Sequence, residues 1–166
     1  MALDGPKGLC LTRQDIPVLE GTAESAREGV ERGGYVLAEA STGSPEVILM
    51  GTGSEVHLAV EAREVLEAEG VPTRVVSMPC VEFFDQQDPE YRESVLPRSV
   101  RARVSVEAGI AMPWYRFLGD AGRAVSLEHF GASAPYQTLF TEFGITGDAV
   151  VAAARDSLAA VNGEAS

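Results

Sequence analysis

Short apolar runs alternate along the chain with segments in which apolar residues recur at helical spacing. The runs predict five strands between residues 35 and 130, in YVLAEA, EVILMG, TRVVSM, VRARVSVE and RAVSLEHF. The run EVILMG is apolar on both faces, as are strands of parallel sheets that are covered on both sides. Strands that alternate with helices in this way predict an α/β fold.

Helical spacing is clearest directly after the second of these strands. Residues 54–69 place Leu58, Ala62 and Leu66 on one side of a helix, which Gly70 should end. Shorter helices are predicted at DPEYRESVL and at PWYRFLG. Helices in these positions would connect neighbouring parallel strands.

The C-terminal part of the chain predicts two further helices. Ser133 is the expected N-cap of a helix over 135–143, and Thr146 can cap a last helix that ends near residue 160. The tail at 161–166 should fray.

The N-terminal stretch KGLCLTRQDIPV contains a further apolar run, at residues 7–12, but no second strand is predicted before Tyr35. The five later strands complete a sheet without this run. Residues 1–20 would then be the terminal strand of a preceding domain that is missing from this chain, or else an extra edge strand of the same sheet. Spacing alone leaves both interpretations open. Residues 21–34 are rich in charge and predict a linker with some helix, which leaves 35–160 as the domain.

Composition narrows the range of partners. The chain of 166 residues has 13 Lys and Arg against 25 Asp and Glu, which gives a net charge of −12. Such a chain repels phosphate backbones, so we expect no nucleic-acid partner and no anionic membrane. An anionic substrate would need a local cationic site.

Cysteine usage and the N-terminal sequence predict a cytoplasmic protein. Cys10 and Cys80 lie far apart, and with two histidines they offer no zinc-binding pattern. Both lie in or beside apolar runs, where buried free thiols are expected. The chain shows no signal-peptide pattern and no apolar stretch of the roughly twenty residues that a membrane span needs.

One turn could bind an anion. Gly51, Thr52, Gly53 and Ser54 join a buried strand to the start of a helix, where free N–H groups and the helix dipole favour negative charge. The turn lacks the third glycine of the dinucleotide fingerprint and the Lys of a P-loop, and Glu55 would repel a pyrophosphate. The alternative is a tight turn in which Thr52 or Ser54 caps the helix.

Four other side chains could take part in acid–base chemistry. His57 lies early in a predicted helix, and His129, Glu107 and Glu128 lie at strand ends, where α/β sheets gather functional groups. A carboxylate at such a place can also be a cap or an ion-pair partner. Because no nucleophile motif accompanies them, we assign no catalytic residue and no metal ligand.

Arg13 follows the first apolar run directly, in Thr12-Arg13-Gln14. An arginine at the exit of a strand can present its planar fork to a phosphate or a carboxylate. It can equally form an ion pair with Asp15 or Glu20. The residues alone do not decide between these roles.

Several segments together resemble one known family. The stretches LTRQDIPVL, GGYVLAEA, PEVILMGTGSEVHLAVEAREVLEAEG, SMPCVEFFDQQDPEYRESVLP, RVSVEAG, WYRFLG and FGASAP occur in the order found in the C-terminal part of transketolase. The resemblance implies a three-layer α/β/α sandwich with a five-stranded mixed sheet whose first strand is antiparallel. Deoxyxylulose phosphate synthase and the 2-oxoacid dehydrogenase β subunits share this domain shape, but TRQ and FGASAP match transketolase better.

The resemblance also implies a function. The parent enzyme would be a homodimer that transfers a two-carbon ketol unit between sugar phosphates, with Arg13 on the substrate phosphate. Thiamine diphosphate and its divalent metal, Mg²⁺, would bind to upstream domains, so the isolated chain should hold no cofactor and be inactive. The alternative is a non-catalytic module for folding, dimerisation or anion-dependent regulation.

Overall fold

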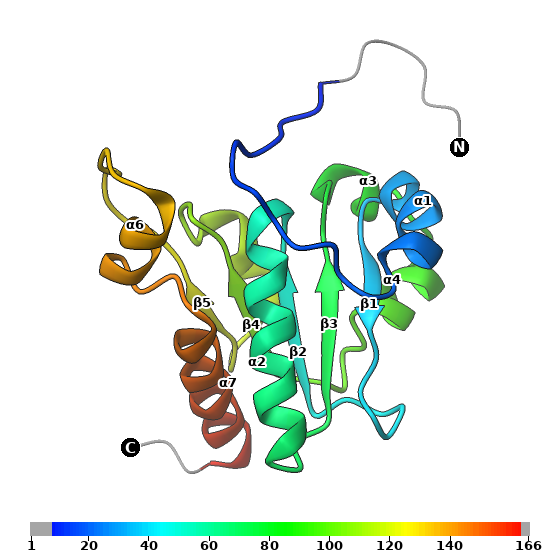
Figure 1. Ribbon diagram of the computed structural model, residues 1–166. Helices are drawn as coiled ribbons and strands as arrows, with labels where there is room; N and C mark the ends of the chain where they lie inside the picture. The colour runs from blue at the N-terminus through cyan, green and yellow to red at the C-terminus, as the bar shows by residue number, and fades with distance from the viewer. Residues whose placement is uncertain (1–7, 164–166) are drawn as a thin grey trace.

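The computed structural model describes residues 8–163, which form a five-stranded mixed sheet in the order β1-β3-β2-β4-β5 (Figure 1). β1 runs antiparallel to β3, and the other neighbouring pairs are parallel. The five-stranded mixed sheet with an antiparallel first strand, which the family resemblance implies, is therefore confirmed. The strands are β1 (Tyr35–Ala38), β2 (Val47–Gly51), β3 (Thr73–Ser77), β4 (Ala102–Val106) and β5 (Arg123–Val125).

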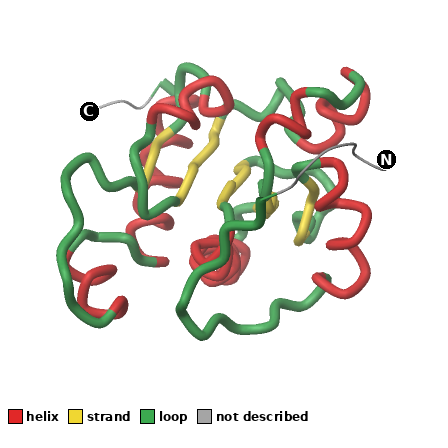
Figure 2. Tube along the Cα trace, turned by 90° about the horizontal axis from the view of Figure 1, so that it is seen from above, coloured by secondary structure: helices red, strands yellow, loops and turns green. Residues whose placement is uncertain are grey.

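Helices cover both faces of the sheet, so the three-layer prediction is confirmed as well (Figure 2). On one face, α2 (Val56–Ala68) and α7 (Gly147–Asn162) lie side by side. The other face is covered by shorter helices. Helix α1 packs beside β1, and α6 lies near the C-terminal ends of the parallel strands. These further helices are α1 (Thr22–Arg32), α3 (Val81–Asp85), α4 (Pro89–Val95), α5 (Tyr115–Leu118) and α6 (Tyr136–Glu142).

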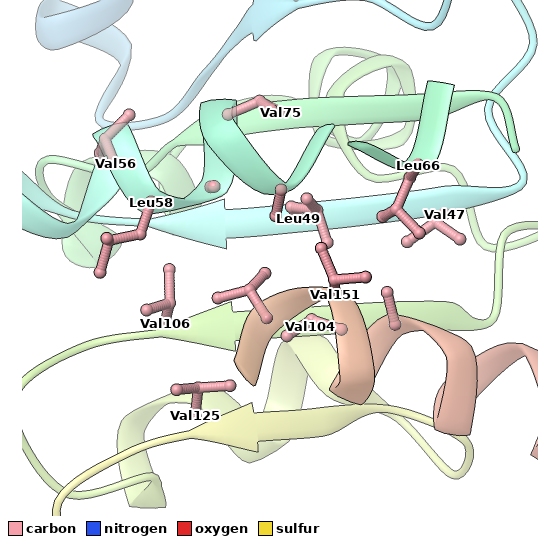
Figure 3. Packing of buried hydrophobic residues seen from close by; sticks show 14 of the residues in the cluster. Val47, Leu49, Val56, Leu58, Leu66, Val75, Val104, Val106, Val125 and Val151 are labelled. Atoms are coloured by element: carbon pink, nitrogen blue, oxygen red, sulfur yellow. The ribbon is translucent and has the colours of Figure 1, made fainter. Parts of the chain in front are cut away.

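The central strand β2 explains why its sequence is apolar throughout. Val47 and Leu49 point into the core beneath α2 and α7, where they meet Leu66 and Val151 (Figure 3). The alternate residues of β2 enter the core on the opposite face of the sheet. Because successive strand residues face opposite sides, a strand covered on both faces needs apolar residues at every position.

Two helix boundaries follow the predicted signals, the end of α2 at Gly70 and the start of α7 at Thr146. A short 3₁₀ turn, η1 (Gly53–Glu55), leads into α2, and the chain leaves that helix at Gly70 with φ at 82°. The Oγ1 atom of Thr146 accepts a hydrogen bond of 3.2 Å from the N–H of Ala149, which caps α7. This last helix continues to Asn162, two residues past its predicted end.

The predicted cap of α6 is wrong. The helix begins at Tyr136 after Pro135, and no side chain caps it. Ser133 lies too early in the chain for its hydroxyl to reach the free N–H groups of the first turn. Helix α3 was not predicted, because a segment of five residues is too short to show a helical period.

β5 is shorter than its sequence predicts. It ends at Val125, because the N–H of Leu127 donates to the carbonyl of Gly109 in a loop and so leaves the ladder. His129 therefore lies in a loop rather than at the end of a strand.

The N-terminal apolar run does not form a strand. Residues 8–12 are irregular, and the side chains of Leu9 and Leu11 are 80% and 76% exposed. A strand needs a neighbour to pair its backbone groups, and the described residues offer none here. Residue 7 of this run lies outside the described residues.

Most of the predicted linker, 21–34, is helix α1. Gly29 brings this helix against the sheet, since a Cβ atom at that position would come within 2.3 Å of the ring of Tyr35. In the part of the chain that the structure describes, no helix has the length and apolarity to cross a membrane.

Candidate functional site

Two segments more than a hundred residues apart form the walls of one cleft, and one of them carries Arg13. The cleft has a volume of about 580 Å³ and is called the Arg13 cleft below. It lies between the TRQ segment on one side and the GASAP loop with the start of helix α6 on the other. Its lining residues are Thr12, Arg13, Gln14, Asp15, Ala132, Ser133, Ala134, Tyr136 and Leu139.

Arg13 is exposed in this cleft, and among residues 8–163 no ion pair joins it to Asp15 or Glu20. The Oγ1 atom of Thr12 accepts a hydrogen bond of 3.1 Å from the N–H of Gln14, which holds the segment in a tight bend. The charge of Arg13 is thus presented to the cleft without a carboxylate that neutralises it directly.

Two further polar side chains of the cleft were not predicted as site residues. The Oε1 atom of Gln14 is shielded from solvent and has no hydrogen-bond partner in the described structure. The hydroxyl of Ser133, which the sequence suggested only as a helix cap, lines the opposite wall. A cation, a free acceptor and a hydroxyl can together bind a phosphate and a neighbouring alcohol group.

The turn from Gly51 to Ser54 lies at the C-terminal end of β2. Gly53 takes a left-handed φ of 56°, which glycine adopts without strain. Neither Thr52 nor Ser54 caps the helix with its side chain; the hydroxyl of Ser54 instead donates to Oε2 of Glu55 at 3.0 Å. The ring of His57 donates from Nδ1 to the carbonyl of Ser54, so it is tied to the same turn.

Two carboxylates make this turn a poor anion site. Glu55 is buried, and burial, together with the charge of Glu107, raises its pKa against the opposing hydrogen bonds from Ser54 and Ala108. Glu107 itself accepts a hydrogen bond of 2.5 Å from the indole of Trp114. An anion bound at the turn would meet these negative charges, so its electrostatics favour a structural role.

Replacing Glu55 by glutamine should change the pH dependence of stability. The raised pKa means that the unfolded chain loses this proton before the folded one as the pH rises. The free energy of unfolding of the wild type should therefore decrease as the pH rises from the ordinary pKa of glutamate to the raised pKa of Glu55. It should stay at the lower value above that pH. We expect Glu55→Gln to be more stable than wild type at pH 7 and equal to it at pH 4, as measured by urea unfolding. A variant that is less stable at pH 7 would contradict this.

The remaining strand-end candidates have structural partners of their own. Glu128 accepts hydrogen bonds of 2.8 Å from the N–H of Ala111 and from the hydroxyl of Ser126, and these lower its pKa. His129 is exposed, and its ring packs edge-on against Phe143 at 4.9 Å. Neither residue lines the Arg13 cleft. Within residues 8–163, no three His, Cys, Asp or Glu side chains come together in a way that could hold a metal ion.

The cysteines differ from the prediction that both are buried. Cys10 is exposed, because the segment around it forms no strand, and Cys80 is half-buried near Oε2 of Glu82 at 3.5 Å. Both are free thiols.

Comparisons with known proteins agree with one another. A family model described as the transketolase-like TK C-terminal domain matches residues 33–146. Transketolase from Mycobacterium leprae (strain TN) is 58% identical over 160 residues, which are 95% of this chain and 22% of that protein. Among solved structures, transketolase from Leishmania mexicana has a TM-score of 0.79 at 39% identity, over 88% of this chain and 20% of that chain. A Pichia stipitis transketolase in complex with sedoheptulose 7-phosphate has a TM-score of 0.78 at 36% identity, over 91% of this chain and 21% of that chain.

The chain thus spans about a fifth of the length of the transketolases it matches. The family match covers most of the sheet and its helices, and the longer match to the Mycobacterium leprae protein extends to both walls of the Arg13 cleft. The matched parts of the solved transketolases have the fold described above. The chain belongs to the transketolase family, in which it corresponds to the C-terminal domain.

Proposed function

We propose that this chain serves as the C-terminal part of a transketolase, a transferase that moves a two-carbon ketol unit between sugar phosphates. The observation that carries the proposal is the 58% identity over 160 residues to a transketolase, a match long enough to include both the TRQ segment and the domain. The parent enzyme would be a homodimer, and this chain would contribute part of the wall of its substrate site.

Arg13 is proposed to bind the phosphate of the sugar substrate. Its guanidinium is exposed in the Arg13 cleft without an ion pair to Asp15 or Glu20, and a planar fork of N–H donors suits phosphate oxygens. Ser133 can donate a hydrogen bond to the same phosphate, and Oε1 of Gln14 can accept one from a sugar hydroxyl. These contacts bind and orient the phosphorylated end of the substrate.

The described residues do not fit thiamine diphosphate or its metal. They bring together no set of acidic, His or Cys side chains able to ligate a cation, and the glycine turn that leads into α2 has buried Glu55 beside it. The resemblance assigns this cofactor and Mg²⁺ to other domains of the parent enzyme. We therefore assign no step of cofactor chemistry to residues of this chain.

The isolated chain should bind no thiamine diphosphate. We expect calorimetric titration of the 166-residue chain with thiamine diphosphate and Mg²⁺ to give only heats of dilution, and the chain to show no ketol transfer. The full-length Mycobacterium leprae transketolase is the matched positive control. Saturable binding at micromolar concentration would show that the cofactor site lies within this chain.

The upstream domains are the proposed partners of the N-terminal segment. Leu9, Leu11 and Val18 expose apolar side chains there, and Phe130 next to the GASAP loop is 99% exposed. Large apolar side chains left this exposed are what a partner domain would cover. Slower hydrogen exchange at residues 8–20 in the full-length enzyme than in the isolated chain would support this, and equal exchange would oppose it.

A further inference from the structure

A second cleft, separate from the Arg13 cleft, gathers four arginine side chains. It lies between α3, α4 and α5 on the face of the sheet opposite α2 and α7, and its volume is about 230 Å³. We call it the arginine cleft. In a chain with a net charge of −12 and 13 Lys and Arg, four of these cations line one small hollow. The charged residues of the arginine cleft are Asp85, Arg92, Glu93, Arg98, Arg103 and Arg116.

Two of the four arginines are paired with the two carboxylates. Arg116 forms an ion pair with Asp85, and the Nε atom of Arg98 lies 3.6 Å from Oε2 of Glu93. The side chain of Arg98 is 94% exposed, so its pair with Glu93 is weak and can rearrange. These pairs leave two arginines without a carboxylate partner of their own.

Arg103 supplies a fixed positive charge on the floor of the arginine cleft. It is half-buried, and burial lowers its pKa, while the charge of Glu93 acts in the opposite direction. Its guanidinium donates hydrogen bonds of 2.7–3.2 Å to four main-chain carbonyl groups, which hold it in place but do not neutralise it. The four carbonyl groups are those of Leu96, Pro97, Val100 and Phe117.

Arg92 is the fourth cation, and it is unpaired. In the described structure its Nε atom is shielded from solvent without a hydrogen-bond partner, and its guanidinium forms no ion pair. Shielded N–H groups normally find an acceptor, because leaving one unpaired costs free energy. Arg92 and Arg103 line the same hollow, so one anion could satisfy both.

We propose that the arginine cleft binds a phosphate group, either free or as part of a small phosphorylated metabolite. Guanidinium groups are the side chains best suited to phosphate, because they offer parallel N–H donors and stay charged. A volume of about 230 Å³ is below that of sites for larger organic ligands and is enough for a phosphate with a short chain attached. The proposal rests on none of the residues of the Arg13 cleft, so it stands apart from the proposed transketolase function.

The test is an NMR titration of the ¹⁵N-labelled 166-residue chain with inorganic phosphate at constant ionic strength. We expect saturable shifts of backbone amides in α4 and α5 and near Arg103. Ribose 5-phosphate and unphosphorylated ribose form two further arms, which separate a phosphorylated metabolite from free phosphate as the preferred ligand. If ribose 5-phosphate binds more tightly than inorganic phosphate, the preferred ligand is a phosphorylated metabolite and not free phosphate.

Arg92→Gln should weaken phosphate binding by about tenfold, because it removes one charge-assisted contact. The substitution breaks no hydrogen bond of the described structure, so the variant should fold, which its amide spectrum checks. The matched control is Arg155→Gln on α7, an exposed arginine paired with Glu69 on the other side of the sheet, and it should leave the affinity unchanged.

Three results would overturn the proposal. Amide chemical shifts that change linearly with phosphate concentration and never saturate would show that no site exists. Equal affinity in wild type and Arg92→Gln would show that the unpaired arginine takes no part. Saturable shifts confined to residues 12–15 and 132–139 would place the only anion site in the Arg13 cleft.

Discussion

Replacing Arg13 by alanine in the proposed parent transketolase should raise the KM for phosphorylated sugar donors by about 10- to 100-fold. A charge-assisted contact to phosphate contributes about 1.5–3 kcal/mol, and each 1.4 kcal/mol is a factor of ten in affinity. In the proposed role the contact would lie away from the reacting carbon, where substrate and transition state are bound alike. The value of kcat should therefore fall less than KM rises. Steady-state kinetics with a phosphorylated donor measures both constants.

An unphosphorylated donor and a second variant provide the controls for Arg13. A short donor without phosphate should be little affected by Arg13→Ala. Arg27→Ala, which removes an exposed arginine of α1, should affect neither donor. Equal losses on both donors in Arg13→Ala would mean that Arg13 holds the junction between domains and does not bind phosphate.

Replacing Arg74 by alanine should produce a large loss of stability, about 3 kcal/mol. Arg74 is buried in β3, where it donates to Glu39 at 2.6 Å and 2.9 Å and to the carbonyls of Ser94 and Val95 at 2.7 Å and 2.9 Å. Its removal breaks these four hydrogen bonds and opens a gap beside the sheet. Urea unfolding of the 166-residue chain measures the loss.

The ion pair of Arg74 and Glu39 also makes the free energy of unfolding depend on pH. Burial raises the pKa of Glu39, but the hydrogen bonds from Arg74 and the Ala40 N–H and the charges of Arg74 and Arg63 together lower it below its ordinary value. The stability from this pair is present above the ordinary pKa of glutamate and is lost as the pH falls through the lowered value. The loss of unfolding free energy in Arg74→Ala should therefore be smaller in acid than at pH 7.

Arg155→Ala is the matched control for Arg74→Ala. Its ion pair with Glu69 is exposed, and such pairs contribute at most about 1 kcal/mol. Similar losses for the two variants would show that the buried contacts of Arg74 contribute no more than a surface ion pair.

The sheet could be predicted because its signals are local. A strand covered on both faces must be apolar throughout, and the run from Val47 to Met50 shows this without any knowledge of its neighbours. Gly70 and Thr146 mark helix ends through their own backbone and side-chain chemistry, and the structure confirms both.

Features that depend on distant residues could not be predicted in the same way. An apolar run such as Leu9 to Leu11 becomes a strand only beside a partner, and none lies next to it in the described structure. The sequence pattern identifies Arg13 as a possible phosphate ligand, but the cleft that it lines together with the Ser133 loop joins segments more than a hundred residues apart. The arginine cleft likewise brings side chains from α4, β4 and α5 together only in the folded chain.

An exchange of domains between two relatives would test the proposed transketolase function directly. The C-terminal segment of the Mycobacterium leprae transketolase that matches this chain would be replaced by the corresponding residues of this chain, which are 58% identical. Size-exclusion chromatography would first establish that the hybrid assembles as the parent does. We expect the hybrid to transfer ketol units between sugar phosphates and to lose affinity for phosphorylated donors when Arg13 is replaced by alanine. A hybrid that folds and assembles like its parent but transfers no ketol unit would contradict the proposed function.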